Sequence, residues 1–106
     1  MIQELTDSDF KEVALSSQKT VLVKFGAEWC GPCKKLVPVL EELDKEINEK
    51  IFIATVDVDK NPETASNYGI MSIPTIIFFK DGIIKEQLKG FVSKATLQKK
   101  LDGYSN

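Results

Sequence analysis

The sequence predicts an α/β fold in which a mixed central sheet of about five strands is flanked by helices on both faces. Apolar, β-rich runs alternate along the chain with segments whose apolar residues recur at helical spacing. Strands joined through helices favour parallel pairing, whereas the last two runs flank the turn residues Asp81 and Gly82 and should pair antiparallel. The chain has 106 residues, of which 42% are hydrophobic, and we expect a single domain over residues 1–106.

The N-terminal segment supplies an edge strand, a helix and a central strand. Met1–Leu5 is the short edge strand in this prediction, and Thr6 caps a helix with Asp9 placed three residues later. Thr20–Phe25 is apolar on both of its alternating faces except at Lys24, and this pattern indicates a strand in the middle of the sheet.

A longer helix follows from Cys33 onward. Its apolar stripe consists of Leu36, Leu40, Leu43 and Ile47. Pro38 lies inside this stripe and should kink the helix rather than end it, because the stripe continues beyond the proline. Ile51–Val58 is the next buried strand.

The second half of the chain contains a short helix and three further elements. Asn61 and Pro62 are typical of a helix start, and Gly69 is typical of a helix end. Thr75–Phe79 is an apolar strand that runs into the predicted hairpin. The chain should close with a returning strand at Ile83–Leu88 and a helix capped by Ser93.

Composition excludes several classes of function. A net charge of −2 without a basic block argues against nucleic acid or an anionic membrane as a partner. The acidic N-terminal segment lacks the features of a secretory signal and no apolar run reaches transmembrane length, so we expect a cytoplasmic protein. The absence of histidine excludes His-based acid–base chemistry and leaves too few ligands for an ordinary structural zinc site.

The two cysteines, Cys30 and Cys33, carry the chemistry that remains. Structural disulfides are uncommon in the cytoplasm, so the pair is either redox-active or metal-binding. At the start of a helix these positions share a face, and their sulfurs can form a disulfide. The helix end and the adjacent Lys34 and Lys35 favour a thiolate, which is the attacking species in disulfide exchange. We expect Cys30 to be exposed and to attack, and Cys33 to be shielded and to act second.

The residues between the cysteines suit this chemistry. Gly31 lets the chain turn tightly, and Pro32 fixes φ where a helix can start. The alternative is half of a metal site, which would need acidic ligands or an ion shared between two chains. That alternative predicts dimerisation on metal addition. We favour redox chemistry and predict neither a metal nor a bound cofactor.

Three segments resemble the thioredoxin family, and the match runs the whole length of the chain. They are FGAEWCGPCKKLVPVLEEL, NPETASNYGIMSIPTIIFFKDG and LKGFVSK. The W-C-G-P-C motif is much more specific than a bare C-x-x-C pair. The resemblance implies the thioredoxin fold, a reversible Cys30–Cys33 disulfide, and reduction of disulfides in other proteins.

The resemblance also assigns roles to residues. It makes Cys30 the nucleophile and Cys33 the resolving cysteine, and Pro74 matches the family's cis-proline, although the sequence alone indicates an ordinary strand start. The family's substrate-facing patch corresponds here to Trp29, Ile73, Pro74, Gly90 and Phe91. Backbone groups near Ile73 would pair with an extended substrate segment. Taken singly, Ile73 and Phe91 would be ordinary core or surface residues.

Three positions depart from the family pattern. Lys24 stands where the family commonly has a buried Asp, and Thr55 stands where it has that residue's Lys partner. Gly26 replaces the usual aromatic residue and leaves space near the site. Lys24 either tunes the cysteine pair or simply reaches solvent. Asp57, which shares the strand face of Thr55, could be its partner.

The resemblance places the protein in cell redox homeostasis, as a monomeric electron carrier recycled by a separate thioredoxin reductase. That reductase would be a flavoprotein using NADPH or a ferredoxin-linked enzyme. An isomerase or an oxidase is an alternative within the same chemistry. A binding module that acts independently of redox chemistry is a different alternative, and the intact cysteine pair argues against it.

Overall fold

The structure is a computed structural model that describes residues 2–47 and 49–105. The order of its helices and strands is the predicted one, and Met1, which begins the predicted first strand, lies outside the described residues. The elements are β1 (Gln3–Leu5), η1 (Lys11–Leu15), β2 (Thr20–Gly26), α1 (Gly31–Glu46), β3 (Ile51–Asp57), α2 (Pro62–Asn67), β4 (Thr75–Lys80), β5 (Ile83–Lys89) and α3 (Lys94–Tyr104).

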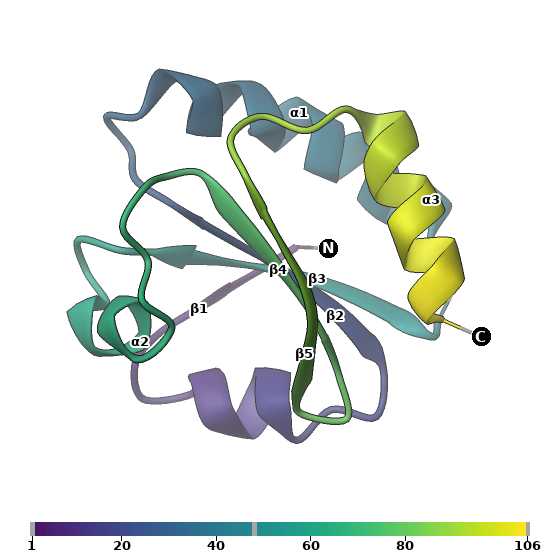
Figure 1. Cartoon of the computed structure of the whole chain (residues 1–106), viewed down its shortest axis with the longest axis horizontal. Helices are drawn as coiled ribbons and strands as arrows, with labels where there is room; N and C mark the ends of the chain where they lie inside the picture. Colours follow the sequence, from purple (N-terminus) through teal and green to yellow (C-terminus); the bar gives the residue numbers. More distant parts are fainter. Residues whose placement is uncertain (1, 48, 106) are drawn as a thin grey trace.

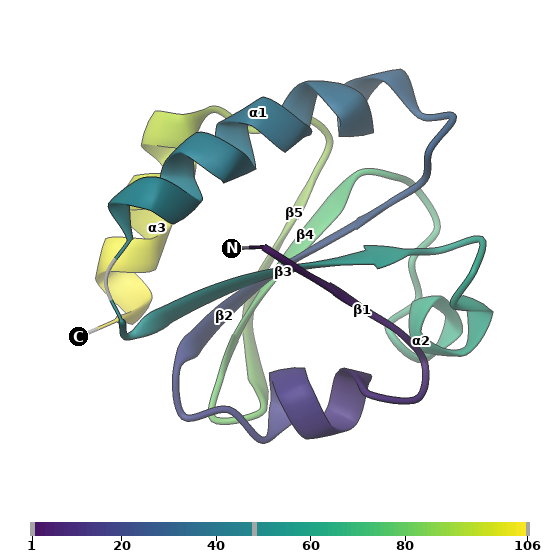
Figure 2. The same cartoon turned by 180° about the vertical axis from the view of Figure 1, so that it is seen from behind.

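A mixed sheet of five strands forms the centre of the molecule, with the strand order β1-β3-β2-β4-β5. β1 and β2 both pair parallel with β3, whereas β4 pairs antiparallel with β2 and with β5. Helices α1 and α3 cover one face, and η1 and α2 cover the other (Figures 1 and 2). The predicted α/β fold and the central position of β2 are therefore confirmed.

Two hydrophobic cores hold the three layers together. The core beneath η1 and α2 is rich in aromatic rings and includes Phe10, Phe25 and Phe79. The core beneath α1 and α3 is mainly aliphatic and includes the stripe residues Leu36, Leu40 and Leu43. Each fully buried side chain of this size contributes about 1.5–3 kcal/mol to folding. Both cores draw on β2, because its successive side chains alternate between the two faces of the sheet.

Helix starts and turns follow the predicted signals, with two differences. The first helix is a five-residue π-helix, η1, that begins only after Phe10, although the Thr6 N–H donates to Asp9 at 2.7 Å as the predicted cap requires. Asn61 lies at the predicted cap of α2, but its side chain does not bond to the helix. Asp7 performs that task from outside, accepting hydrogen bonds from the Thr64 N–H and hydroxyl. A cap supplied by a residue so distant in sequence leaves no local signal.

The hairpin and the proline helix agree with the sequence prediction. Asp81 and Gly82 both have positive φ, 53° and 77°, as a tight turn between twisted strands requires. Helix α1 continues past Pro38 to Glu46, as the apolar stripe indicates.

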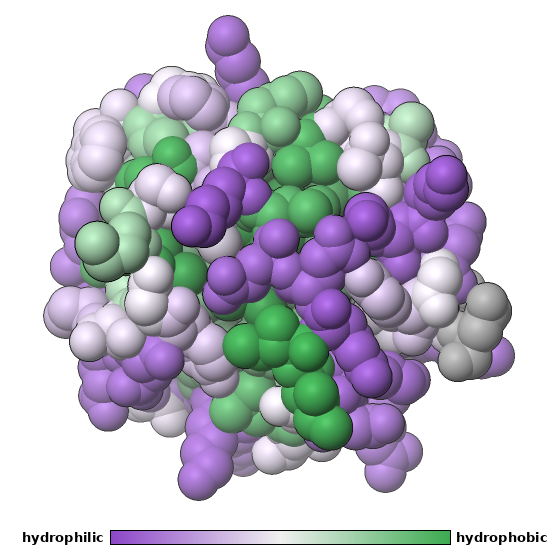
Figure 3. Space-filling model, in the orientation of Figure 1, coloured by the Kyte–Doolittle hydropathy of each residue, from purple (hydrophilic) through white to green (hydrophobic). Residues whose placement is uncertain are grey.

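β5 is an edge strand, and its outer surface is partly apolar. The face shown in Figure 3 carries hydrophobic side chains between hydrophilic groups. On β5, Ile83 and Ile84 are exposed. Lys85 and Lys89 lie on the same strand, and charges on an edge oppose pairing with another chain. Within the described residues, no helix has the length and apolar character needed to cross a membrane.

Candidate functional site

The cysteine pair lies where the central strand β2 meets the start of α1. Cys30 is the N-cap residue of α1, and Gly31 and Pro32 are its first two residues, as the sequence indicates. Cys30 and Cys33 form a disulfide, with their Cα atoms 5.2 Å apart. The Cys33 N–H donates to Cys30 Sγ at 3.3 Å. An amide donor and the positive end of the helix both favour negative charge on the Cys30 sulfur.

The expectation that Cys30 is exposed is wrong in this disulfide form, whereas Cys33 is shielded as expected. Cys30 is 5% exposed and Cys33 is 2% exposed. Both pack with Ala27, and the partly buried Ile73 lies against this cluster. Cys30 is covered because its sulfur turns inward to meet Cys33, so position along the chain did not report its accessibility.

The Ile-Pro-Thr segment borders the disulfide. The carbonyl oxygen of Ile73 lies 3.9 Å from Cys30 Sγ, and the Ile73–Pro74 peptide bond is cis, as the family resemblance implies. The Gly90 N–H donates to the Pro74 carbonyl at 2.8 Å and so brings the last segment of the predicted patch beside the proline. Ile73, Pro74 and Gly90 therefore assemble around the cysteine pair.

Large apolar side chains surround this segment at the surface. Trp29 is 69% exposed and Phe91 is 51% exposed, as a substrate-facing patch requires. Met71, which the sequence prediction missed, is 92% exposed and lies two residues before Ile73. Its position next to the Ile-Pro-Thr motif could have indicated a place in the substrate-facing patch, because flexible methionine side chains suit surfaces that accept varied partners.

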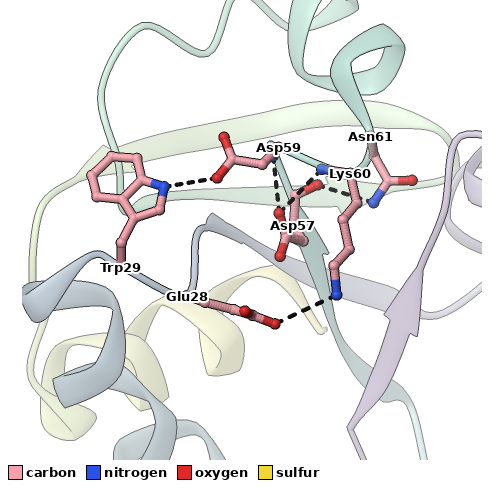
Figure 4. A network of polar contacts seen from close by, with 6 residues as sticks. All are labelled: Glu28, Trp29, Asp57, Asp59, Lys60 and Asn61. Atoms are coloured by element: carbon pink, nitrogen blue, oxygen red, sulfur yellow. Dashed lines mark hydrogen bonds and ion pairs between the residues drawn. The ribbon is translucent and has the colours of Figure 1, made fainter.

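A polar network fixes the loop that carries the cysteines to the loop after β3 (Figure 4). The Trp29 indole N–H donates to Asp59 at 2.7 Å, and Lys60 pairs with Glu28 at 3.4 Å. Asp57 Oδ1 accepts the backbone N–H groups of Asp59 and Lys60 at 2.9 and 3.2 Å. These contacts hold Trp29 beside the disulfide, and no motif in the sequence indicated them.

Lys24 lies in a cavity of about 340 Å³ that Cys33 also lines. Lys24 is only 9% exposed, so most of its side chain is buried. Burial lowers the pKa of Lys24, and the nearby Asp57 carboxylate opposes that shift. The sequence therefore predicted the Asp57 neighbour correctly. Thr55 pairs in register with Lys24 across β2 and β3 and lines the same cavity.

Gly26 separates the lysine from the second cysteine. A Cβ atom at Gly26 would lie 3.1 Å from Cys33 Sγ and 3.4 Å from Lys24 Cε. These two atoms are therefore no further apart than the sum of those distances. Any larger side chain at this position would press against the cysteine.

The geometry defines a class of protein. A disulfide at a helix start, with an amide directed at the first sulfur and a neighbouring apolar patch, performs dithiol–disulfide exchange with other molecules.

Comparison with known proteins specifies the family. The thioredoxin family model matches residues 1–103. The chain is 50% identical to a thioredoxin of Bacillus subtilis over 97 residues, covering 92% of this chain and 91% of that protein. It is 46% identical to a thioredoxin of Rickettsia prowazekii, covering 92% of each, and 45% identical to a chloroplastic M-type thioredoxin of Pisum sativum, covering 97% of this chain and 60% of that protein. The chain belongs to the thioredoxin family.

Family membership and the cysteine geometry together establish the activity. The protein is a thiol–disulfide oxidoreductase that reduces disulfides in other proteins through the reversible Cys30–Cys33 pair. Its partners are protein disulfides and a reductase that restores the dithiol.

Proposed function

We propose that the protein transfers two electrons to a substrate disulfide in two steps, with Cys30 as the nucleophile and Cys33 as the resolving thiol. The Cys30 thiolate attacks one substrate sulfur, forms a mixed disulfide and releases the first substrate thiolate. Cys33 then loses its proton, attacks the Cys30 sulfur and releases the second substrate thiol. The observation that carries this order is the Cys33 N–H directed at Cys30 Sγ, because that donor stabilises charge on the first sulfur.

The substrate patch consists of Trp29, Ile73, Pro74, Gly90 and Phe91 in this proposal. An extended substrate segment pairs with the backbone near Ile73, whose carbonyl already lies beside Cys30 Sγ. The exposed Trp29 and Phe91 side chains supply the apolar contacts on either side. Met71 extends the same patch.

The protein acts as a monomeric electron carrier in the cytoplasm in this proposal. Its bacterial relatives support that setting, although a chloroplastic relative also exists. The charged edge strand β5 supports the monomer. Either a flavoprotein that uses NADPH or a ferredoxin-linked enzyme restores the dithiol.

Lys24 makes the redox potential less negative than a buried carboxylate at the same position would. A cation near the cysteines stabilises the thiolate and hence the reduced protein. The burial of Lys24 within the cavity beneath Cys33 supports this role over the alternative that Lys24 reaches solvent.

Reduction of insulin disulfides tests the proposal. The wild-type protein should accelerate insulin reduction by dithiothreitol, and the Cys30→Ser/Cys33→Ser variant should not. Replacing dithiothreitol with each of the two reductase systems then identifies the electron donor. A wild-type rate equal to that of the double variant would refute the exchange function and favour a binding module.

A further inference from the structure

The cavity beneath α1 places a cation beside the second sulfur rather than the first. Cys33 lines this cavity together with Lys24 and Gly26. Both Lys24 Cε and Cys33 Sγ lie within 3.4 Å of one point, the position of a Cβ atom at Gly26. Cys33 is 2% exposed, and burial in apolar surroundings disfavours its thiolate. The thiolate of Cys33 therefore needs a stabilising partner. Lys24 is the cation that β2 places beside it.

Charged groups from several elements surround the cavity that holds Lys24. They come from β1, the loop after β2, α1, β3 and the loop after β3, and are Glu4, Glu28, Lys34, Asp57 and Lys60. Asp57 raises the pKa of Lys24 against the effect of burial. Because two backbone N–H groups donate to Asp57 Oδ1, that carboxylate is held in place on the lysine's side of the cavity.

We propose that the Lys24 ammonium, which shares its cavity with Asp57, is the counter-ion that stabilises the Cys33 thiolate while the mixed disulfide is resolved. This inference rests on the proposed order of attack, in which Cys33 acts second. Lys24 is a positioning residue here, because it acts on substrate only through Cys33.

The step balances without a protein group that accepts the proton. The Cys33 thiol releases its proton to water in the cavity, which is open, charged and large enough to hold several water molecules. The thiolate, paired with Lys24, attacks Cys30 Sγ, and the bond from Cys30 to the substrate breaks. The substrate sulfur leaves with the electron pair and takes up a proton from solvent. Lys24 keeps its own proton throughout.

A two-phase stopped-flow experiment tests the proposal. The reduced protein is mixed with an aromatic disulfide whose thiolate product absorbs visible light, so that attack by Cys30 gives the first release and resolution by Cys33 gives the second. In Lys24→Met the second phase should slow about tenfold at neutral pH, and its pH midpoint should rise by about one unit, once the attraction is discounted for solvent near the cavity. Lys24→Arg, which keeps the charge, should retain most of the rate.

The matched control removes a charge from the exposed surface of helix α3. Lys99→Met should change the second phase less than about threefold, because exposed charges are screened. Equal second phases in the wild type and Lys24→Met would overturn the proposal, and so would an Arg variant as slow as the Met variant. Loss of the first phase in the wild type would instead refute the proposed function.

The ionisation of Cys33 can also be measured separately from the resolution step, in variants that are shown to be folded. In Cys30→Ser protein, Cys33 is the only thiol, and its alkylation rate against pH reports its ionisation directly. Adding Lys24→Met to this background should move the Cys33 titration to higher pH by about one unit. The unfolding midpoint of each variant establishes that it is folded, and an unchanged titration in a folded variant would overturn the proposal.

Discussion

Reversing the charge at Lys24 should make the redox potential more negative. The distances around Gly26 put the lysine side chain within contact range of the cavity wall that holds Cys33 Sγ. At a separation of about 7 Å and an effective dielectric constant of about 20, a unit charge and a thiolate interact by roughly 2 kcal/mol. The shorter Asp side chain stays within the same cavity, where water screens its charge, so its repulsion adds about 1 kcal/mol in Lys24→Asp.

Only part of this energy appears in the potential at neutral pH. For a reduced state with equal parts of thiol and thiolate, about half of the interaction, between 1 and 2 kcal/mol, changes the stability of the reduced state. For a two-electron couple, about 1.4 kcal/mol corresponds to about 30 mV. Lys24→Asp should therefore shift the potential by about 20–40 mV toward more negative values.

Equilibration with glutathione mixtures measures this shift, and thiolate absorbance against pH measures the accompanying rise in the thiol pKa of the cysteine pair. Lys99→Asp makes the same charge change on the exposed surface of α3 and controls for net charge. If Lys24→Asp moves the potential no more than Lys99→Asp does, the cation does not act on the sulfurs and the reasoning fails.

Three further perturbations test the structure around the site. Because burial holds the pKa of Lys24 below its unfolded value of 10.5, the ammonium destabilises the fold most at pH values below the folded pKa. Lys24→Met should therefore raise the urea midpoint at neutral pH, and its advantage should fade as the pH rises toward 10.5. Asp59→Ala should shift the fluorescence of Trp29, the single tryptophan, and slow insulin reduction about two- to fivefold, because the indole loses its acceptor. The Thr64 hydroxyl, more than the backbone donors, lowers the pKa of Asp7 below 3.8, so this carboxylate stabilises the fold above that pH and less as the pH falls through the folded pKa. Asp7→Asn should lower the urea midpoint at neutral pH and reduce the fall of that midpoint at acidic pH. An unchanged fall of the midpoint at acidic pH would contradict the role of Asp7 as the cap of α2.

Local patterns predicted most of the fold. Strands such as Thr20–Phe25 are continuous apolar runs, and the Asp81-Gly82 turn has a backbone requirement that few other residues meet. The exceptions depend on contacts between distant segments. Asp7 caps α2 from a different part of the chain, and no spacing rule reports such a contact.

For the site, too, local motifs were predictable from the sequence and contacts between distant segments were not. The W-C-G-P-C motif indicated the chemistry of Cys30 and Cys33, because a helix start imposes both geometry and charge on the sulfurs. It could not predict that Cys30 would be buried in the disulfide, since exposure depends on packing against Ile73. The bond from Trp29 to Asp59 also required the folded loops to be placed side by side.

The most direct test of the central claim is to trap the mixed disulfide and map its position. Cys33→Ser protein, incubated with a disulfide-bonded protein substrate, should accumulate a covalent adduct whose bond mass spectrometry assigns to Cys30. Cys30→Ser protein, under the same conditions, should accumulate little adduct, because Cys33 lacks the amide donor that stabilises the first sulfur. Stable adducts formed mainly through Cys33 would contradict the account.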